Sequence, residues 1–122
     1  MAPAVHHVFA GDHALGGERH SIEAVRAWFE RLFRLFPSLE FSIHRMTSHG
    51  VPWNIWVAVE WSAKATPAAG DAYVNRGAHW INLRKGRVVY FHAYEDSQAV
   101  ALACDRMAAL GIAEAAAPPI TD

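Results

Sequence analysis

Several features of membrane, secreted and nucleic-acid-binding proteins are missing from this 122-residue sequence. Its single cysteine, Cys104, excludes an internal disulfide framework and is typical of a reducing compartment such as the cytoplasm. No apolar run approaches the roughly 20 residues that span a bilayer, and the N-terminus lacks the regions of a signal peptide. We therefore expect a soluble, cytoplasmic protein with no membrane partner.

Charge is also scarce in the sequence. Eleven basic and twelve acidic residues give a formal net charge of -1, and the longest basic run is Arg84-Lys85-Gly86-Arg87. This is too little positive charge for a nucleic-acid interface, so we expect no nucleic-acid partner.

Apolar and aromatic residues dominate what remains. Hydrophobic residues make up 52% of the chain and charged residues 19%, with five Trp and six Phe. A chain of this length hides roughly two-thirds of its extended surface when it folds, which is enough for one real core. The composition predicts a single globular domain over residues 1–122, with an Ala/Pro-rich tail at 113–122.

The periodicity of apolar residues predicts strands and helices in a definite order. An amphipathic helix begins at Ile22, after a Ser21 N-cap, and stops at Pro37. A second helix follows the N-cap candidate Asp96 over residues 97–110 and ends at Gly111. Strands are predicted at residues 5–10, 40–48, 53–62, 72–83 and 87–95.

Side-chain alternation then assigns faces to the strands. Residues 53–62 place Trp53, Ile55, Val57, Val59 and Trp61 on one side. In the last hairpin, a three-residue turn at 84–86 with a left-handed Gly86 pairs His79 with Phe91 and Ile81 with Val89, on a face shared with Gly77 and Ala93. A two-residue turn would reverse this assignment. The order predicts an α+β fold, in which a strongly curved antiparallel or mixed sheet wraps on helices as a cone.

Two stretches carry a resemblance to a known family. HVFAGDHALGGERHSIEAVRAWF and GAHWINLRKGRVVYFHAYEDSQ resemble the nuclear transport factor two-like superfamily, in particular its SnoaL-like polyketide cyclase and ketosteroid isomerase-like branches. The resemblance runs from about Val5 to Leu110 and implies an apolar conical pocket beneath the sheet. Members usually begin with one or two helices that close the cone, and in the isomerases these carry an oxyanion-hole tyrosine. Here Met1 stands four residues before the first strand, so either the chain is shortened or a partner subunit covers the pocket.

The resemblance also implies site residues. It places the isomerases' general-base aspartate at Asp12, where a poorly hydrated carboxylate would suit proton abstraction; the alternative is an aspartate that caps a solvated turn. It places His79 near the isomerases' second, hydrogen-bond-donating acid, with an ordinary sheet histidine as the alternative. Arg19 either pairs with Asp12 or clamps an anionic ligand. The expected pocket residues are Phe9, His13, Arg19, Trp28, Trp53, Val57, Ile81, Phe91 and Glu95.

The remaining polar candidates are weaker. Glu95 is a possible substitute for the acid that related cyclases hold near position 93, whereas Asp96 is better explained as an N-cap. His13 and His20 either shuttle protons or are simply solvated, and solvation is favoured. The sequence has eight histidines but no HExxH or clustered Cys/His spacing, and the adjacent His6 and His7 point to opposite sides of a strand. We therefore expect no metal and no cofactor.

These observations predict a cofactor-independent isomerase, cyclase or hydrolase that acts on a small apolar carbonyl compound or epoxide with an Asp general base. The alternative is a non-catalytic domain of the same fold that binds a small hydrophobic ligand or dimerises. Outward aromatic side chains, Trp56, Trp80, Tyr90 and Tyr94, predict a homodimer through the outer face of the sheet.

Overall fold

The computed structural model describes all residues, 1–122. The order is two strands, a helix, four strands and a helix, followed by a short 3-10 helix. The bounds are β1 (His6–Phe9), β2 (Gly17–Arg19), α1 (Ile22–Leu35), β3 (Glu40–Val51), β4 (Asn54–Ala65), β5 (Tyr73–Arg84), β6 (Arg87–Glu95), α2 (Ser97–Ala109) and η1 (Ala113–Ala116).

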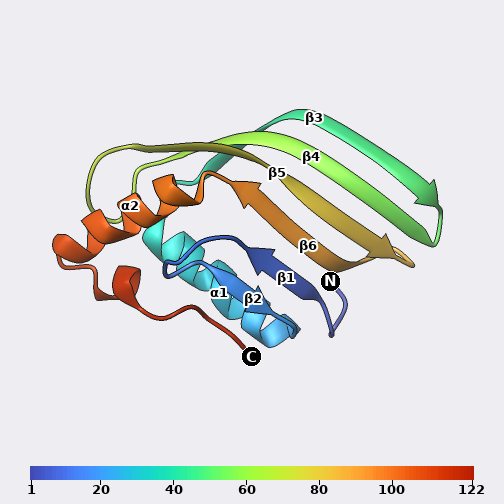
Figure 1. Cartoon of the computed structure of the whole chain (residues 1–122), viewed down its shortest axis with the longest axis horizontal. Helices are drawn as coiled ribbons and strands as arrows, with labels where there is room; N and C mark the ends of the chain where they lie inside the picture. Colours follow the sequence, from blue (N-terminus) through green and yellow to red (C-terminus); the bar gives the residue numbers. More distant parts are fainter.

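The six strands form one open, mixed sheet in the order β2-β1-β6-β5-β4-β3. The pairing of β1 with β6 is parallel and all other pairs are antiparallel. The long strands β3, β4 and β5 are curved, and α1 lies beneath the concave face of the sheet (Figure 1). This confirms the predicted α+β fold with a curved sheet wrapped on helices. Strand β2 was not predicted.

Local chemistry fixes the two helices. The Ser21 side chain accepts a hydrogen bond from the backbone N–H of Ala24 and caps α1, which ends at Leu35, before Pro37. The Asp96 side chain accepts from the N–H groups of Gln98 and Ala99 at the start of α2. Both N-cap predictions are confirmed, so the Asp96 carboxylate is occupied by the helix.

The β5–β6 hairpin reaches the predicted faces by a different route. Arg84 pairs with Arg87 across a two-residue turn, in which Lys85 and Gly86 both have positive φ, 52° and 76°. A bulge between Asn82 and Leu83 then shifts the register, so that His79 pairs with Ala93. The turn length and pairs predicted from the sequence were wrong, but the bulge compensates and the predicted inner face is retained.

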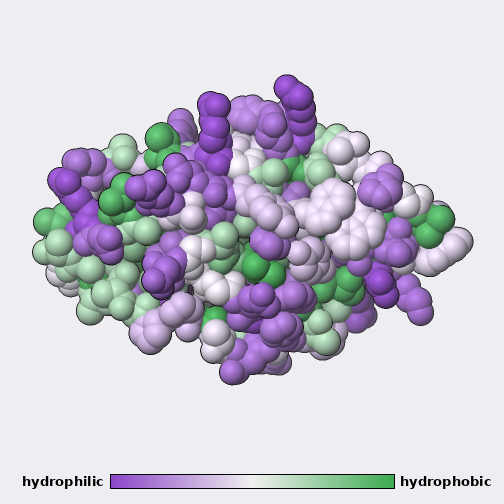
Figure 2. Space-filling view, viewed as in Figure 1, coloured by the Kyte–Doolittle hydropathy of each residue, from purple (hydrophilic) through white to green (hydrophobic).

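The hydrophobic core lies mainly between the two helices. Trp28, Leu32 and Leu35 of α1 pack with Val100 and Met107 of α2 in the largest buried cluster. Smaller clusters line the inner face of the sheet near β4 and near β6. On the face seen in Figure 2, hydrophilic side chains are spread widely and hydrophobic ones form separate groups. Neither helix has the length and hydropathy that a membrane span requires.

The C-terminal segment is folded against the domain. In η1, Glu114 accepts hydrogen bonds from Arg31 and from both Nε and Nη2 of Arg34. The Ile120 carbonyl accepts from Arg19 Nε, and the Asp122 side chain accepts from the backbone N–H of His20. The predicted Ala/Pro-rich tail is therefore tied to α1 and β2.

Candidate functional site

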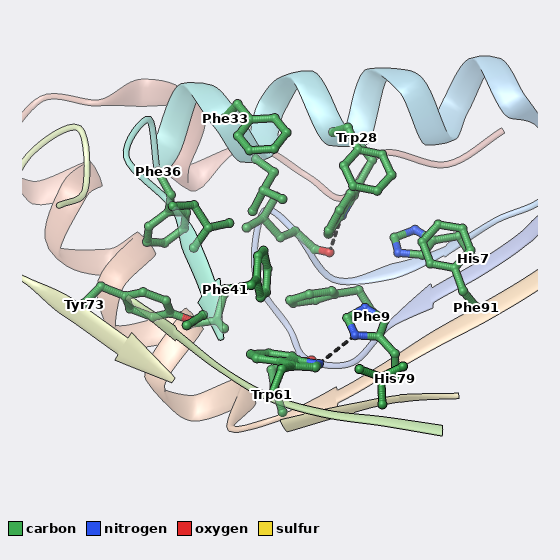
Figure 3. A pocket seen from close by; sticks show the side chains of 18 of the residues that line it. His7, Phe9, Trp28, Phe33, Phe36, Phe41, Trp61, Tyr73, His79 and Phe91 are labelled. Atoms are coloured by element: carbon green, nitrogen blue, oxygen red, sulfur yellow. Dashed lines mark hydrogen bonds between the residues drawn. The ribbon is translucent and has the colours of Figure 1, made fainter. Parts of the chain in front are cut away.

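A cavity of about 450 Å³ lies between α1 and the inner face of the sheet. Of its 20 lining residues, 17 are hydrophobic, so its preferred occupant is apolar. Helix α1 contributes Trp28 and Phe33, and strand β4 contributes Trp61 (Figure 3). The volume is that of a small-molecule site, and the few polar groups in its wall are therefore the chemically informative ones.

The mouth of the cavity is apolar too. Phe33 of α1 and Phe41 and Ile43 of β3 line the cavity, yet they are 50%, 51% and 61% exposed. Because exposed residues that also line a cavity must stand where it meets solvent, the opening lies between α1 and β3. A ligand that enters here passes aromatic and aliphatic side chains before it meets any polar group.

Glu95, at the end of β6, is the only carboxylate that lines the cavity. Both of its carboxylate oxygens are buried and neither has a hydrogen-bond partner. Burial, with a smaller contribution from the neighbouring Asp96, raises the pKa of Glu95 to about 8. The side chain therefore exchanges a proton near neutral pH, as an acid or base in a proton transfer must.

His79 of β5 lies on the same face of the sheet as Glu95, since His79 pairs with Ala93 and Gly77 pairs with Glu95. Trp61 Nε1 donates a hydrogen bond to His79 Nδ1 at 2.7 Å (Figure 3). An indole can only donate, so Nδ1 is unprotonated and the imidazole proton is on Nε2. Burial lowers the pKa of His79, which keeps the ring neutral. His79 is thus a fixed neutral N–H donor in the cavity wall.

His7 of β1 is a second imidazole in the wall. Arg19 Nη1 donates to His7 Nδ1 at 2.8 Å, which again leaves the proton on Nε2. That Nε2 is buried without a partner. Burial, followed by the charge of Arg19, lowers the pKa of His7 to about 2, so the ring stays neutral. The sequence predicted that His6 and His7 face opposite sides but gave His7 no role.

Tyr73 of β5 completes the polar set. Its hydroxyl accepts a hydrogen bond from Asn75 Nδ2 at 2.7 Å, so its own proton is free to donate. Burial raises the pKa of Tyr73 to about 12. No sequence motif pointed to Tyr73; the only signal was its place on the same alternating face as His79.

Six of the predicted site residues line the cavity: Phe9, Trp28, His79, Ile81, Phe91 and Glu95. Five do not: Asp12, His13, Arg19, Trp53 and Val57. Asp12 is exposed in the loop between β1 and β2. Trp53 is 64% exposed because it lies in the β3–β4 turn, before β4 begins.

Two of these five residues are buried for other reasons. Arg19 is fully buried and donates to His7, to the Gly16 carbonyl and to the Ile120 carbonyl, so it contacts neither Asp12 nor the cavity. His13 accepts a hydrogen bond at Nδ1 from the Leu15 N–H, within the same loop. The polar residues of this loop thus support the site from behind, and Leu15 is the one residue of the loop that lines the cavity.

Comparisons with known proteins agree with this architecture. The model of the SnoaL-like domain matches residues 1–91, so the chain belongs to the SnoaL-like domain family, within the nuclear transport factor two-like (NTF2-like) superfamily. Among curated proteins, none matches this sequence significantly.

Solved structures show the same fold at low identity. An NTF2-like protein of unknown function from Burkholderia pseudomallei is 20% identical, with a TM-score of 0.70 over 80% of this chain and 74% of the other. A putative SnoaL-like polyketide cyclase from a Jannaschia species is 23% identical, with a TM-score of 0.65 over 84% and 72%. The protein TerC, co-crystallised with polyporic acid, is 15% identical, with a TM-score of 0.65 over 81% and 75%.

Proposed function

We propose that the protein binds a small apolar carbonyl compound in the cavity and moves a proton on it without a cofactor. The observation that carries this proposal is the Glu95 carboxylate, whose two oxygens are buried and unpartnered in the wall of an apolar cavity. A buried polar group without a partner is costly, and a ligand that exchanges a proton with it offsets that cost. TerC, which shares the fold, was co-crystallised with a small molecule, polyporic acid, and this supports a small-molecule ligand.

The reaction uses the polar groups as follows. Ionised Glu95 removes a proton from the carbon beside the carbonyl, and the electron pair moves into an enolate. The Nε2–H of His79 donates a hydrogen bond to the enolate oxygen, where negative charge develops. Glu95 then returns the proton to the same or another carbon, which gives exchange or isomerisation with no change in atoms overall. In this proposal Glu95 takes the role that the sequence suggested for Asp12.

Deuterium exchange tests the proposal before the natural substrate is known. A panel of apolar ketones, including β,γ-unsaturated ketones, is incubated with protein in deuterated buffer, and loss of the α-proton signals is followed by NMR. We expect Glu95→Gln to lower the exchange rate by at least about 100-fold. Asp12→Asn, the matched control, leaves the rate within a factor of two. The reverse pattern, with Asp12→Asn inactive, would restore Asp12 as the base.

The pH dependence is a second check on the same base. Because the base acts only when ionised, the exchange rate should rise with pH with a midpoint at about 8, the pKa of Glu95. Below that pH the protonated fraction grows and the rate falls. A rate that is already constant from pH 5 upward would point to an ordinary, solvated carboxylate instead.

Binding without chemistry is the second candidate function, favoured by the almost wholly hydrophobic lining. The two functions separate cleanly. If apolar ketones quench the fluorescence of Trp28 and Trp61 in a saturable way, yet no ketone in the panel exchanges its α-protons, then the cavity is a ligand carrier.

A further inference from the structure

Three side chains of types that can bind a metal ion, His6, Glu18 and His20, lie together outside the cavity, on and next to the β1–β2 hairpin. Nε2 of His6 is 3.1 Å from Glu18 Oε2, and Nε2 of His20 is 3.9 Å from the same oxygen. One ligand atom from each of the three residues lies within 4.8 Å of the others. The proposed function uses none of these residues.

Strand pairing explains why the three side chains meet. His7 pairs with Arg19 and Val8 with Glu18, so His6 lies next to His20 across the antiparallel pair and Glu18 lies one step along the same face. His7 and Phe9 point to the cavity, so His6 and Glu18 are on the outer face of the sheet. The rings of His6 and His20 stack at 4.5 Å with an interplanar angle of 21°. This group is not evident from the sequence, because Glu18 is 12 positions after His6 and His20 is two positions after Glu18.

We propose that His6, Glu18 and His20 bind a divalent late transition metal, with Zn²⁺ as the reference ion. Two imidazoles and one carboxylate form a three-ligand set that Zn²⁺ accepts, with further positions left to water. Bonds of about 2.0–2.2 Å in a tetrahedral arrangement require donor atoms about 3.3–3.5 Å apart. The distances of 3.1 and 3.9 Å to Glu18 are close to this, and small rotations of exposed side chains close the difference.

A fourth residue supports the assignment. Asp122 Oδ2 lies 3.5 Å from Nδ1 of His20, the nitrogen that faces away from Glu18. The Asp122 carboxylate is itself held by the backbone N–H of His20 and by the Ser21 hydroxyl. A carboxylate close to the far nitrogen of a histidine favours the tautomer with its proton on that nitrogen, and the near nitrogen is then free to bind metal, as is common in the outer shell of zinc sites.

A bound ion would cross-link β1 to β2, and it would also stabilise the C-terminal segment, because Asp122 contacts the ligand His20. Because a metal that binds only the folded state stabilises it, the melting temperature should rise with metal concentration. His6 is adjacent to His7, and Arg19 lies between Glu18 and His20, so the ion would also steady the hairpin that carries the His7–Arg19 pair.

Calorimetric titration of the chelator-treated full chain with ZnCl₂ tests the site. We expect saturable binding of one ion per chain, and a Co²⁺-loaded sample should show the visible absorption bands of a site with imidazole ligands. His6→Ala and His20→Ala should each weaken binding at least about 100-fold, and Asp122→Asn about 10-fold. His44→Ala and His49→Ala, which remove exposed histidines from β3, are the matched controls and should bind as the wild type does.

The same measurements show which results would contradict the metal site. If no saturable binding occurs up to about 1 mM Zn²⁺, or if His6→Ala and His20→Ala bind as tightly as the His44→Ala control, the proposal is wrong. Circular dichroism of each variant shows whether it is folded, and Glu18→Gln, which keeps the size of the side chain, repeats the test without disturbing either histidine.

Discussion

The position of Glu95 in the cavity wall depends on Gly77, which has no side chain. Gly77 pairs with Glu95 across β5 and β6. A Cβ at position 77 would overlap the Tyr94 carbonyl oxygen and lie 2.9 Å from the Glu95 Cβ. Glycine is thus required here for close approach of two backbones, and the position of the carboxylate depends on it.

Substitution of Gly77 should therefore affect both stability and chemistry. We expect Gly77→Ala to lower the free energy of unfolding by about 1–3 kcal/mol, because the strands must separate to admit the methyl group. We also expect it to reduce the α-proton exchange rate. Denaturant melts and NMR exchange measure the two effects. Gly86→Ala, at a turn position with no atom within 4 Å of the added carbon, should cost stability through its positive φ alone and keep the exchange rate. Equal exchange rates in the two variants would contradict this role of Gly77.

The raised pKa of Glu95 also predicts how stability depends on pH. The folded state binds the Glu95 proton more tightly than the unfolded state does. The contribution of this proton to the free energy of unfolding is therefore fully present below about pH 4.5 and is lost as the pH rises through about 8. Between pH 5 and pH 8.5 the wild type should lose stability relative to Glu95→Gln, by on the order of 2 kcal/mol after allowance for solvent screening. Urea melts of both proteins across this range give the difference, in which contributions common to both, such as that of His7, cancel. A constant difference would mean that Glu95 titrates as a solvated acid.

Single residues show where sequence reasoning succeeded and where it stopped. Strand alternation, together with an assumed turn length, placed His79 and Glu95 on the inner face, and the placement holds because a bulge offsets the wrong turn length. Asp12 was placed by analogy with the isomerases, and its loop instead leaves it exposed. Which loop residue reaches a cavity depends on the path of the backbone between strands, and neither periodicity nor residue type specifies that path.

At the scale of elements, the β5–β6 hairpin illustrates how two errors can cancel. A turn one residue shorter than predicted reverses the faces, and one extra residue in β6 restores them. The hydrophobic pattern selects faces, since a one-residue slip would move Phe91 and His79 to solvent. It does not select between a longer turn and a shorter turn with a bulge. The short strand β2, in a polar loop, had no apolar pattern to reveal it.

The short helix η1 is held by ion pairs of Glu114 and by burial of Ala115 in the main core. Glu114 is 28% exposed and makes paired hydrogen bonds of 2.7 Å with Arg34. We expect Glu114→Gln to destabilise the C-terminal segment by about 0.5–1 kcal/mol and to speed hydrogen exchange of the Ala115 and Ala117 amides. Exchange NMR at low salt detects this.

A comparable surface ion pair provides the control. Arg45 and Glu60 lie 3.7 Å apart on β3 and β4 and are 84% and 55% exposed. Glu60→Gln should change stability by less than about 0.5 kcal/mol. If the two substitutions have the same effect, η1 is held by its apolar contacts rather than by Glu114.

At the scale of the whole molecule, the outer face of the sheet carries stacked aromatic rings. Trp56 and Trp80 stack at 5.3 Å, and His92 and Tyr94 at 4.0 Å, with Tyr94 53% exposed. Aromatic side chains are enriched in protein interfaces, so we propose that this face forms a homodimer.

Light scattering tests the homodimer directly. The wild type should have twice the chain mass at about 50 µM, and Tyr94→Glu should shift it toward the monomer, because a charge in an apolar interface is costly. Leu102→Glu, at an exposed position on α2, should leave the dimer intact. A monomeric wild type at that concentration would rule out a stable dimer.

Strand β3 has neighbours on one side only, and its whole length is exposed. The same strand supplies Phe41 and Ile43 at the cavity mouth. An unpaired strand edge that carries exposed apolar side chains is the kind of template on which chains add to one another and aggregate. A ligand in the cavity would contact Phe41 and Ile43 and so cover part of the apolar surface of this strand. The unliganded protein should therefore precipitate faster on storage than the liganded protein.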